Sequence, residues 1–251
     1  MPELDLSKEM NIAIKAALSS GKYLKKNKIE LNKTLSSNSR DIKLDADVAS
    51  ENLIKEIINE SSNYEILAEE SGKSSEDLGS TFWVVDPLDG TANYNRDIPI
   101  CCISIGMVKD MKPLFGVIYD FNSDEIYCGD CINKVATLNN SQIKVSKVGD
   151  KKDGILITGL PFNSDYSDKS LNNLISDMQS WKKTRMIGSA AMASCYIASG
   201  KAEVYKEKGI YLWDILAGAA IVEAAGGLAE IKNVKDNHQV DVIFSNLEIK
   251  G

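Results

Sequence analysis

Residues 83–94, WVVDPLDGTANY, are the most informative segment of this sequence. Its beginning, together with Phe82, is apolar and β-branched, which predicts a buried strand over residues 82–85 that ends at the Asp-Pro pair. Two carboxylates, Asp86 and Asp89, then flank a proline and are followed at once by Gly-Thr. Oxygen ligands of this kind suit Mg²⁺ or Mn²⁺ beside a phosphate. A solvated turn is the alternative, since Asp, Pro and Gly also form turns.

Five motifs of this sequence resemble those of one known family. Residues 86–91 resemble the Asp-Pro-x-Asp-Gly-Thr signature of the inositol monophosphatase family of metal-dependent phosphomonoesterases. One such motif is a weak signal, but several in a fixed order form a specific one. The other four occur in the family's order, from about residue 40 to residue 230: DIKLDAD at 41–47, AEES at 68–71, GSAA at 188–191 and WDILAG at 213–218.

The resemblance implies a site with two or three Mg²⁺ ions, which Mn²⁺ could replace. Glu69, Asp86 and the backbone carbonyl of Leu88 would bind the first ion. Asp86, Asp89 and Asp214 would bind the second, with Asp86 bridging the two. A third, weaker ion would contact Glu69 through water.

The resemblance also implies which residues act on the substrate. Asp47 and Thr91 would orient and deprotonate the attacking water, with Glu69 as a third catalytic residue. The N–H groups of Gly90 and Thr91 can donate to phosphate oxygens, and glycine lets the backbone approach closely. The implied substrate contacts are Asp89, Gly90, Thr91, Gly188, Ser189, Ala190, Glu207 and Asp214.

Three of these assignments have structural alternatives. Asp47 and Asp214 each lie at the start of a predicted helix, where an aspartate can serve only as the N-cap. Glu207 stands between Lys206 and Lys208 and could be a solvated charge.

The chain also departs from the family pattern in three places. Ala68 replaces a glycine, and Lys43 and Asp45 replace the commoner Val and Thr before Asp47. Residues 32–39 diverge, which leaves the third ion and lithium sensitivity open.

These observations predict a Mg²⁺-dependent phosphomonoesterase that hydrolyses a small polyol or sugar phosphate, most simply inositol-1-phosphate, through a metal-activated water. Residues 92–94 (ANY) resemble the Thr-x-Asn-Phe form of inositol and sugar phosphatases. Fructose-1,6-bisphosphatase, histidinol-phosphatase and 3′-phosphoadenosine-5′-phosphate phosphatase activities remain alternatives. A catalytically silent interaction protein would have lost a motif ligand, and none is lost. A Ca²⁺-binding module would show a contiguous acidic loop, which this sequence lacks.

Composition limits the partners and the compartment. The chain has 251 residues, 43% hydrophobic and 26% charged, with a net charge of −7 that disfavours nucleic acid or an anionic membrane. The N-terminus lacks a basic and apolar leader, and no run of about 18 apolar residues occurs, so we expect a cytoplasmic location. The family resemblance favours a homodimer.

Cysteine and histidine usage bears on the chemistry. Cys128 and Cys131 form one C-x-x-C pair, for which zinc or redox chemistry is the alternative to simple packing. The single histidine, His238, leaves histidine-based phosphatase mechanisms with little support.

Hydrophobic periodicity divides the chain into an α+β half (1–147) and an α/β half (148–251). The first half should contain a helix at 6–24, a mobile loop at 27–39, a helix from 45 or 47 to 59 and an antiparallel meander from 99 to 145. The second should alternate strands and helices and contribute Asp214. The resemblance implies a layered αβαβα sandwich of the sugar-phosphatase type. The predicted elements of the second half are strands at 154–158, 184–187, 202–206, 228–231 and 240–245, and helices at 169–181, 189–199 and 213–225.

Overall fold

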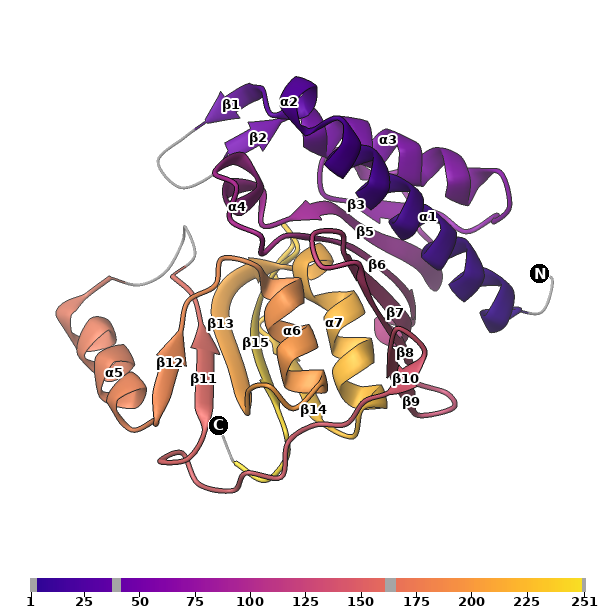
Figure 1. Ribbon diagram of the computed structural model, residues 1–251. Helices are drawn as coiled ribbons and strands as arrows, with labels where there is room; N and C mark the ends of the chain where they lie inside the picture. Colours follow the sequence, from indigo (N-terminus) through magenta and orange to yellow (C-terminus); the bar gives the residue numbers. More distant parts are fainter. Residues whose placement is uncertain (1–3, 38–41, 161–165, 250–251) are drawn as a thin grey trace.

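The computed structural model describes residues 4–37, 42–160 and 166–249, and these form five alternating layers of helices and sheets. Figure 1 shows α1 and α3 outside a first sheet, α6 and α7 between the two sheets, and α5 beyond the second sheet. This order confirms the predicted αβαβα sandwich. Among the described residues, no helix combines the length and the apolar character needed to cross a membrane.

The first sheet has eight strands in the order β10-β9-β8-β7-β6-β5-β3-β4. All its neighbours pair antiparallel except β3 and β5, which are parallel. The run from β6 to β10 is therefore the predicted meander, and β5 adds one more antiparallel strand to it. Its strands are β3 (Ile66–Ala68), β4 (Gly72–Lys73), β5 (Thr81–Asp89), β6 (Cys102–Lys109), β7 (Lys112–Asp120), β8 (Glu125–Asp130), β9 (Val135–Leu138) and β10 (Ser141–Gln142).

Strand β5 continues through the Asp-Pro pair to Asp89, so the prediction that it ends there was wrong. Asp86 pairs with Ser104 and Asp89 with Cys102, so three steps along β5 face two along β6. This bulge accommodates Pro87, which has no N–H to give to a neighbouring strand. The strand thus carries both carboxylates into the interior.

Helices α1 (Leu6–Lys26) and α3 (Asp45–Asn59) cover the outer face of this sheet. Both match the predicted helices, and the buried face of α1 centres on Ile12, Ala13 and Ala16. The predicted loop at 27–39 was wrong in its described part. It contains the short helix α2 (Lys28–Leu31) and the strand β1 (Thr34–Ser37), which pairs with β2 (Ile42–Leu44). Residues 38–41, including Asp41 of the first motif, lie outside the described residues.

The second sheet has five strands in the order β12-β11-β13-β15-β14. Strand β11 is parallel to both neighbours, whereas β15 is antiparallel to β13 and β14. The predicted elements are present, with β13 longer than expected. They are β11 (Ile155–Thr158), α5 (Asp168–Gln179), β12 (Lys183–Arg185), α6 (Ala190–Ala198), β13 (Val204–Tyr211), α7 (Leu212–Ala224), β14 (Leu228–Lys232) and β15 (Gln239–Ser245).

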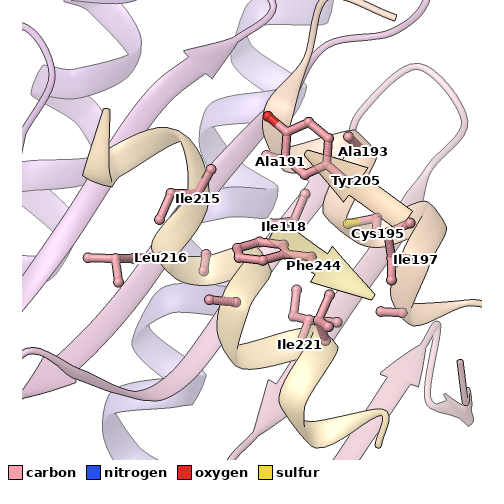
Figure 2. Packing of buried hydrophobic residues seen from close by; sticks show 14 of the residues in the cluster. Ile118, Ala191, Ala193, Cys195, Ile197, Tyr205, Ile215, Leu216, Ile221 and Phe244 are labelled. Atoms are coloured by element: carbon pink, nitrogen blue, oxygen red, sulfur yellow. The ribbon is translucent and has the colours of Figure 1, made fainter. Parts of the chain in front are cut away.

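Helix α7 joins the two sheets. Figure 2 shows Ile215 and Ile221 of this helix in one cluster with Ile118 of β7 and Phe244 of β15. This core spans both sheets, and the division of the chain near residue 147 stays a prediction.

A stripe of glycines sets how closely α7 approaches the first sheet. Gly106, Gly116 and Gly129 are paired side by side across β6, β7 and β8. A Cβ atom on Gly116 would collide with the backbone of Ala217 in α7, and one on Gly129 with the backbone of Ile221. The helix therefore lies directly on the sheet backbone, and this contact fixes its N-terminal turn.

We expect Gly116→Ala to lower the free energy of unfolding by about 1–3 kcal/mol, because the added methyl meets helix backbone that cannot rotate away. Denaturant titration followed by circular dichroism measures this loss. Gly149→Ala is the control, since a Cβ atom there meets nothing within 4 Å. Equal stability of the two variants would contradict the close-packing explanation.

Candidate active site

Parallel pairing of β3 and β5 brings the first two motif carboxylates together. Ala68 pairs with Val85, and the N–H of Glu69 donates to the carbonyl of Val85 at 3.1 Å. Glu69, directly after β3, and Asp86, within β5, therefore lie next to each other on adjacent strands. Asp86 is 2% exposed, and its Oδ1 accepts from the N–H of Leu88 at 2.9 Å.

Asp47 approaches the same loop from the first turn of α3. It occupies the third helical position, and its Oδ2 accepts from the N–H of Leu44 at 2.6 Å. The N-cap position belongs to Leu44, so the N-cap alternative was wrong. The Thr91 hydroxyl lies 2.9 Å from Asp47 Oδ1 and 2.9 Å from the carbonyl of Leu88. Asp47 and Thr91 are thus in direct contact, as a shared role requires.

Burial raises the pKa of Asp47 to about 6, although the hydrogen bonds from Leu44 and Thr91 oppose this effect. The carboxyl is 1% exposed. Its protonation therefore changes within the pH range in which enzymes work.

Asp214 enters from α7 in a similar way. It too is the third helical residue, and its Oδ2 accepts from the N–H of Tyr211 at 2.9 Å. Tyr211 holds the N-cap position, so the N-cap alternative was also wrong for Asp214. Both aspartates bond a helix's first free N–H groups while keeping their second oxygen for other contacts.

Asp89 is bound to the N-terminus of α6, 100 residues further along the chain. Ser189 donates its hydroxyl to Asp89, and the N–H groups of Ala191 and Ala190 lie 2.8 and 3.3 Å from its oxygens. The positive end of the helix dipole favours a carboxylate at this point. Ser189 and Ala190, predicted as substrate contacts, thus contact the protein's own carboxylate in this arrangement.

The motif carboxylates raise each other's pKa values. Burial is the largest cause for Glu69, Asp86 and Asp89. The negative charge of Asp214 then adds to the pKa of Glu69, and the charges of Glu69, Asp89 and Asp214 add to that of Asp86. Buried like charges of this kind favour the protonated form until a cation compensates them.

The donor chemistry fits a hard divalent cation, since every motif ligand is an oxygen and the cluster is negatively charged when ionised. In the parts of the chain that the structure describes, no three acidic, thiol or imidazole side chains are already grouped around one metal position. Two of the motif carboxylates are turned towards hydrogen-bond donors of the protein. Asp89 accepts from the N-terminus of α6, and Asp214 accepts from the N–H of Tyr211. Joint coordination by all four carboxylates requires these bonds to be exchanged.

A cavity of about 460 Å³ opens beside Asp89. It brings together six predicted residues from four segments: Asp89, Gly188, Ser189, Ala190, Glu207 and Asp214. Glu69, Asp86, Asp47, Leu88, Gly90 and Thr91 are not among its lining residues. The cavity is therefore bounded by six of the predicted substrate contacts, of which Asp89 also belongs to the motif at the end of β5.

Glu207 is half-buried in the wall of this cavity, so the solvated-charge alternative was wrong. The Tyr205 hydroxyl donates to its Oε2 at 2.9 Å, and burial raises its pKa to about 7. Its carboxylate rests against Gly159, where a Cβ atom would occupy the same space.

Two glycines shape the backbone next to the site. Gly90 has φ +87°, and a Cβ atom there would stand 2.8 Å from the carbonyl of Ile100. Gly188 has φ +71° and lies against the side chain of Asn93. Both conformations are strained for other residues.

Asn93 is a residue whose role sequence reasoning missed. Its side-chain amide donates to the carbonyls of Ile100 and Ile187, each at 2.8 Å. It therefore ties the loop after β5 to the segment before α6. The position of Asn93, shortly after the Gly-Thr turn, suggested a role near the site. Its hydrogen-bond partner Ile187 could not be predicted, because it lies 94 residues away in the sequence.

The remaining candidates lie away from this site. Cys131 contacts the carbonyl of Ala220 at 3.5 Å. Burial raises the pKa of Cys128 to about 11 and of Cys131 to about 12, the reverse of a reactive thiol. His238, in the loop between β14 and β15, packs edge-on against Trp213 at 5.9 Å.

Comparison with known proteins gives a consistent picture. A family model described as the inositol monophosphatase family matches residues 5–243. The chain is 35% identical over 227 residues to a "Nus factor SuhB" of Pasteurella multocida, covering 87% of this chain and 83% of that protein. It is 33% identical to a "Fructose-1,6-bisphosphatase/inositol-1-monophosphatase" of Aquifex aeolicus, covering 89% and 86%. The structure of an inositol monophosphatase from Anabaena superposes with a TM-score of 0.83 at 32% identity, covering 97% and 92%.

We expect Asp86→Asn to stabilise the protein at pH 8 in EDTA. Burial raises the folded-state pKa of Asp86 above its ordinary value of 3.8, so the folded state retains a proton that the unfolded chain releases. Stability is therefore lost as the pH rises above that ordinary value, and the amide removes this charge. The unfolding temperature of the variant should exceed the wild-type value at pH 8, and the difference should shrink at pH 5.

Asp120→Asn is the matched control. Asp120 is also a buried carboxylate, but it accepts from the N–H groups of Asn122 and Ser123. We expect that variant to be less stable at both pH values. An Asp86→Asn protein that is equally destabilised at pH 8 would refute mutual repulsion within the cluster.

Proposed function

The chain belongs to the inositol monophosphatase family and is a phosphoric monoester hydrolase, and from this premise we propose that it hydrolyses a small polyol or sugar phosphate, most simply inositol-1-phosphate, with Mg²⁺. The observation that carries the proposal is the cavity beside Asp89, where six of the eight predicted substrate contacts meet.

We assign the cation ligands to Glu69, Asp86, Asp89, Asp214 and the carbonyl of Leu88. Two or three Mg²⁺ ions are proposed, with Mn²⁺ as a substitute. When bound, such ions neutralise phosphate charge and lower the pKa of a coordinated water. The raised pKa values of Glu69 and Asp86 support this assignment, because bound cations relieve the repulsion that causes part of each shift.

Asp47 and Thr91 are proposed to accept the proton of the attacking water. With a pKa of about 6, Asp47 is ionised at neutral pH and close enough to neutral to act as a base. The Thr91 hydroxyl carries one proton and has two acceptors, Asp47 and the carbonyl of Leu88. With Asp47 ionised, Thr91 can donate to Asp47 and accept a hydrogen bond from the water, so that the water proton would pass to Thr91 as the Thr91 proton passes to Asp47. We assign Glu69 a third catalytic role, in orienting that water.

Phosphate binding is assigned to the turn after β5. The backbone N–H groups of Gly90 and Thr91 stand at the start of α4 (Thr91–Asn95). They can donate to phosphate oxygens while Asp89 reaches the cavity. The leaving group would then lie among Gly188, Ser189, Ala190 and Glu207.

One observation favours a bisphosphate as a second candidate substrate. A neighbouring cavity of about 640 Å³ shares Thr158, Gly159, Leu160 and Glu207 with the first. Lys208 and Lys235 also line it and offer cations to a second anionic group, whereas Lys206 is paired with Asp177. A fructose-1,6-bisphosphatase activity would use both cavities. The bifunctional name of the Aquifex aeolicus relative agrees with this candidate.

A substrate panel tests the proposal. We expect inorganic phosphate release from inositol-1-phosphate in Mg²⁺ and none in EDTA. Fructose-1,6-bisphosphate, histidinol phosphate and 3′-phosphoadenosine-5′-phosphate are assayed separately as alternative substrates. Asp89→Asn should reduce turnover by about 100-fold or more, since it removes a cation ligand and the charge facing α6. Near-wild-type turnover of that variant would defeat the ligand assignment, and no release from any substrate in Mg²⁺ would defeat the function.

The pH profile tests the assigned base. Because only ionised Asp47 accepts a proton, kcat/KM should fall about tenfold for each pH unit below about 6. Asp47→Asn should lower kcat by about 10²–10⁴-fold and abolish this acidic limb. Asp45→Asn, in the same helical turn, is the control that should keep the limb. An unchanged limb in Asp47→Asn would assign it to another group.

We also propose a homodimer, as the family resemblance implies. Light scattering coupled to size-exclusion chromatography measures the mass directly, and a mass near the 27.5 kDa of one chain would contradict it.

A further inference from the structure

Two buried serines connect the outer helices to the bulge of β5. Ser20 of α1 and Ser50 of α3 are both 0% exposed, and their hydroxyl oxygens lie 2.6 Å apart. The Ser50 hydroxyl also donates to the carbonyl of Pro87 at 2.6 Å. Neither serine belongs to a residue set that the resemblance assigns to the site.

The two hydrogen bonds run in the same direction, from Ser20 through Ser50 to the carbonyl of Pro87. A serine hydroxyl carries a single proton, and Ser50 gives its proton to Pro87. Ser20 must therefore donate to Ser50, and the two hydroxyls form a chain that ends on the carbonyl of Pro87. Donation from Ser20 polarises Ser50 and strengthens its bond to the carbonyl.

This chain orients one particular peptide unit. The carbonyl of Pro87 and the N–H of Leu88 are opposite ends of the same planar group. Ser50 holds the carbonyl end, and Asp86 Oδ1 accepts from the N–H end at 2.9 Å. Rotation of this peptide would break both bonds together.

The bulge makes this support necessary. Register pairing with β6 covers Asp86 and Asp89 but skips Pro87 and Leu88. The peptide between them therefore takes its hydrogen bonds from side chains and not from the neighbouring strand. The orientation of this peptide determines where the Asp86 carboxylate is held, because its N–H donates to Asp86 Oδ1. It also determines the direction of the Leu88 backbone, and therefore of the Leu88 carbonyl.

We propose that Ser20 and Ser50 are positioning residues for the cation site, acting through the Pro87–Leu88 peptide on Asp86 and Leu88. This inference rests on the proposed function, which assigns those two residues as cation ligands. The serines touch neither substrate nor cation. They hold Asp86 and the carbonyl of Leu88 in position before a cation binds.

Mn²⁺ binding without substrate tests the inference separately from turnover. Calorimetric titration of Ser50→Ala should show Mn²⁺ affinity reduced about tenfold or more, the usual effect of removing a group that orients a metal ligand. Ser62→Ala is the matched control, because Ser62 is also buried and accepts from Trp83 Nε1 of the same strand at 3.0 Å. We expect that control to bind Mn²⁺ as the wild type does.

Ser20→Ala gives a second test that does not depend on Ser50→Ala folding. It should weaken Mn²⁺ binding in the same direction and to a smaller extent. The double variant should bind no more weakly than Ser50→Ala alone, since the chain is already broken. Ser50→Thr, which keeps the hydroxyl, should restore most of the affinity.

Three outcomes would overturn the inference. They are wild-type Mn²⁺ affinity in both alanine variants, an equal loss in Ser62→Ala, or full additivity of the Ser20 and Ser50 effects. In each case the proposed function would stand, provided that the wild type binds Mn²⁺. A wild type that binds no Mn²⁺ would overturn the cation assignment and the inference together.

Discussion

Burial of several carboxylates next to one another is the constraint on which the rest of this structure depends. Glu69 follows β3, Asp86 lies in the β5 bulge and Asp89 ends β5, and the pKa of each is raised because burial opposes ionisation. The protein limits this cost with oriented N–H groups. Asp89 bonds the start of α6, and Asp214 bonds the N–H of Tyr211. The same features that make the site costly to fold make it attractive to cations.

Two halves of the chain must meet for such a site to exist. The first sheet supplies the β5 bulge, whereas Asp214 and the Ser189 segment come from helices of the middle layer. Close packing of α7 on the glycine stripe and the Asn93 bonds to Ile100 and Ile187 fix the two parts relative to each other. The packing of the layers against each other therefore sets the relative positions of the site residues.

Sequence reasoning succeeded where the signal was local. Periodicity located the helices and strands of both halves, and the motif resemblance gathered residues that line one cavity, such as Asp89, Glu207 and Asp214. It failed where a distant partner decides. Pro87 read as a strand end because the register shift that tolerates it involves β6, and residues 34–37 read as a loop because their partner is β2. The Ser50 contact likewise depends on a helix 37 residues away in sequence.

The glycine stripe has a consequence for ion selectivity. Because α7 rests on sheet backbone with no intervening side chains, the spacing between Asp214 and the β5 carboxylates is set by main-chain contact. Such a spacing does not relax through rotamer changes, unlike one set by long side chains. Mg²⁺ demands a tighter and more regular shell of oxygens than Ca²⁺, which tolerates wider and looser ones. Under the proposed ligand assignment, a spacing fixed by main-chain contact would favour cations of one radius, through glycines that bind no cation themselves.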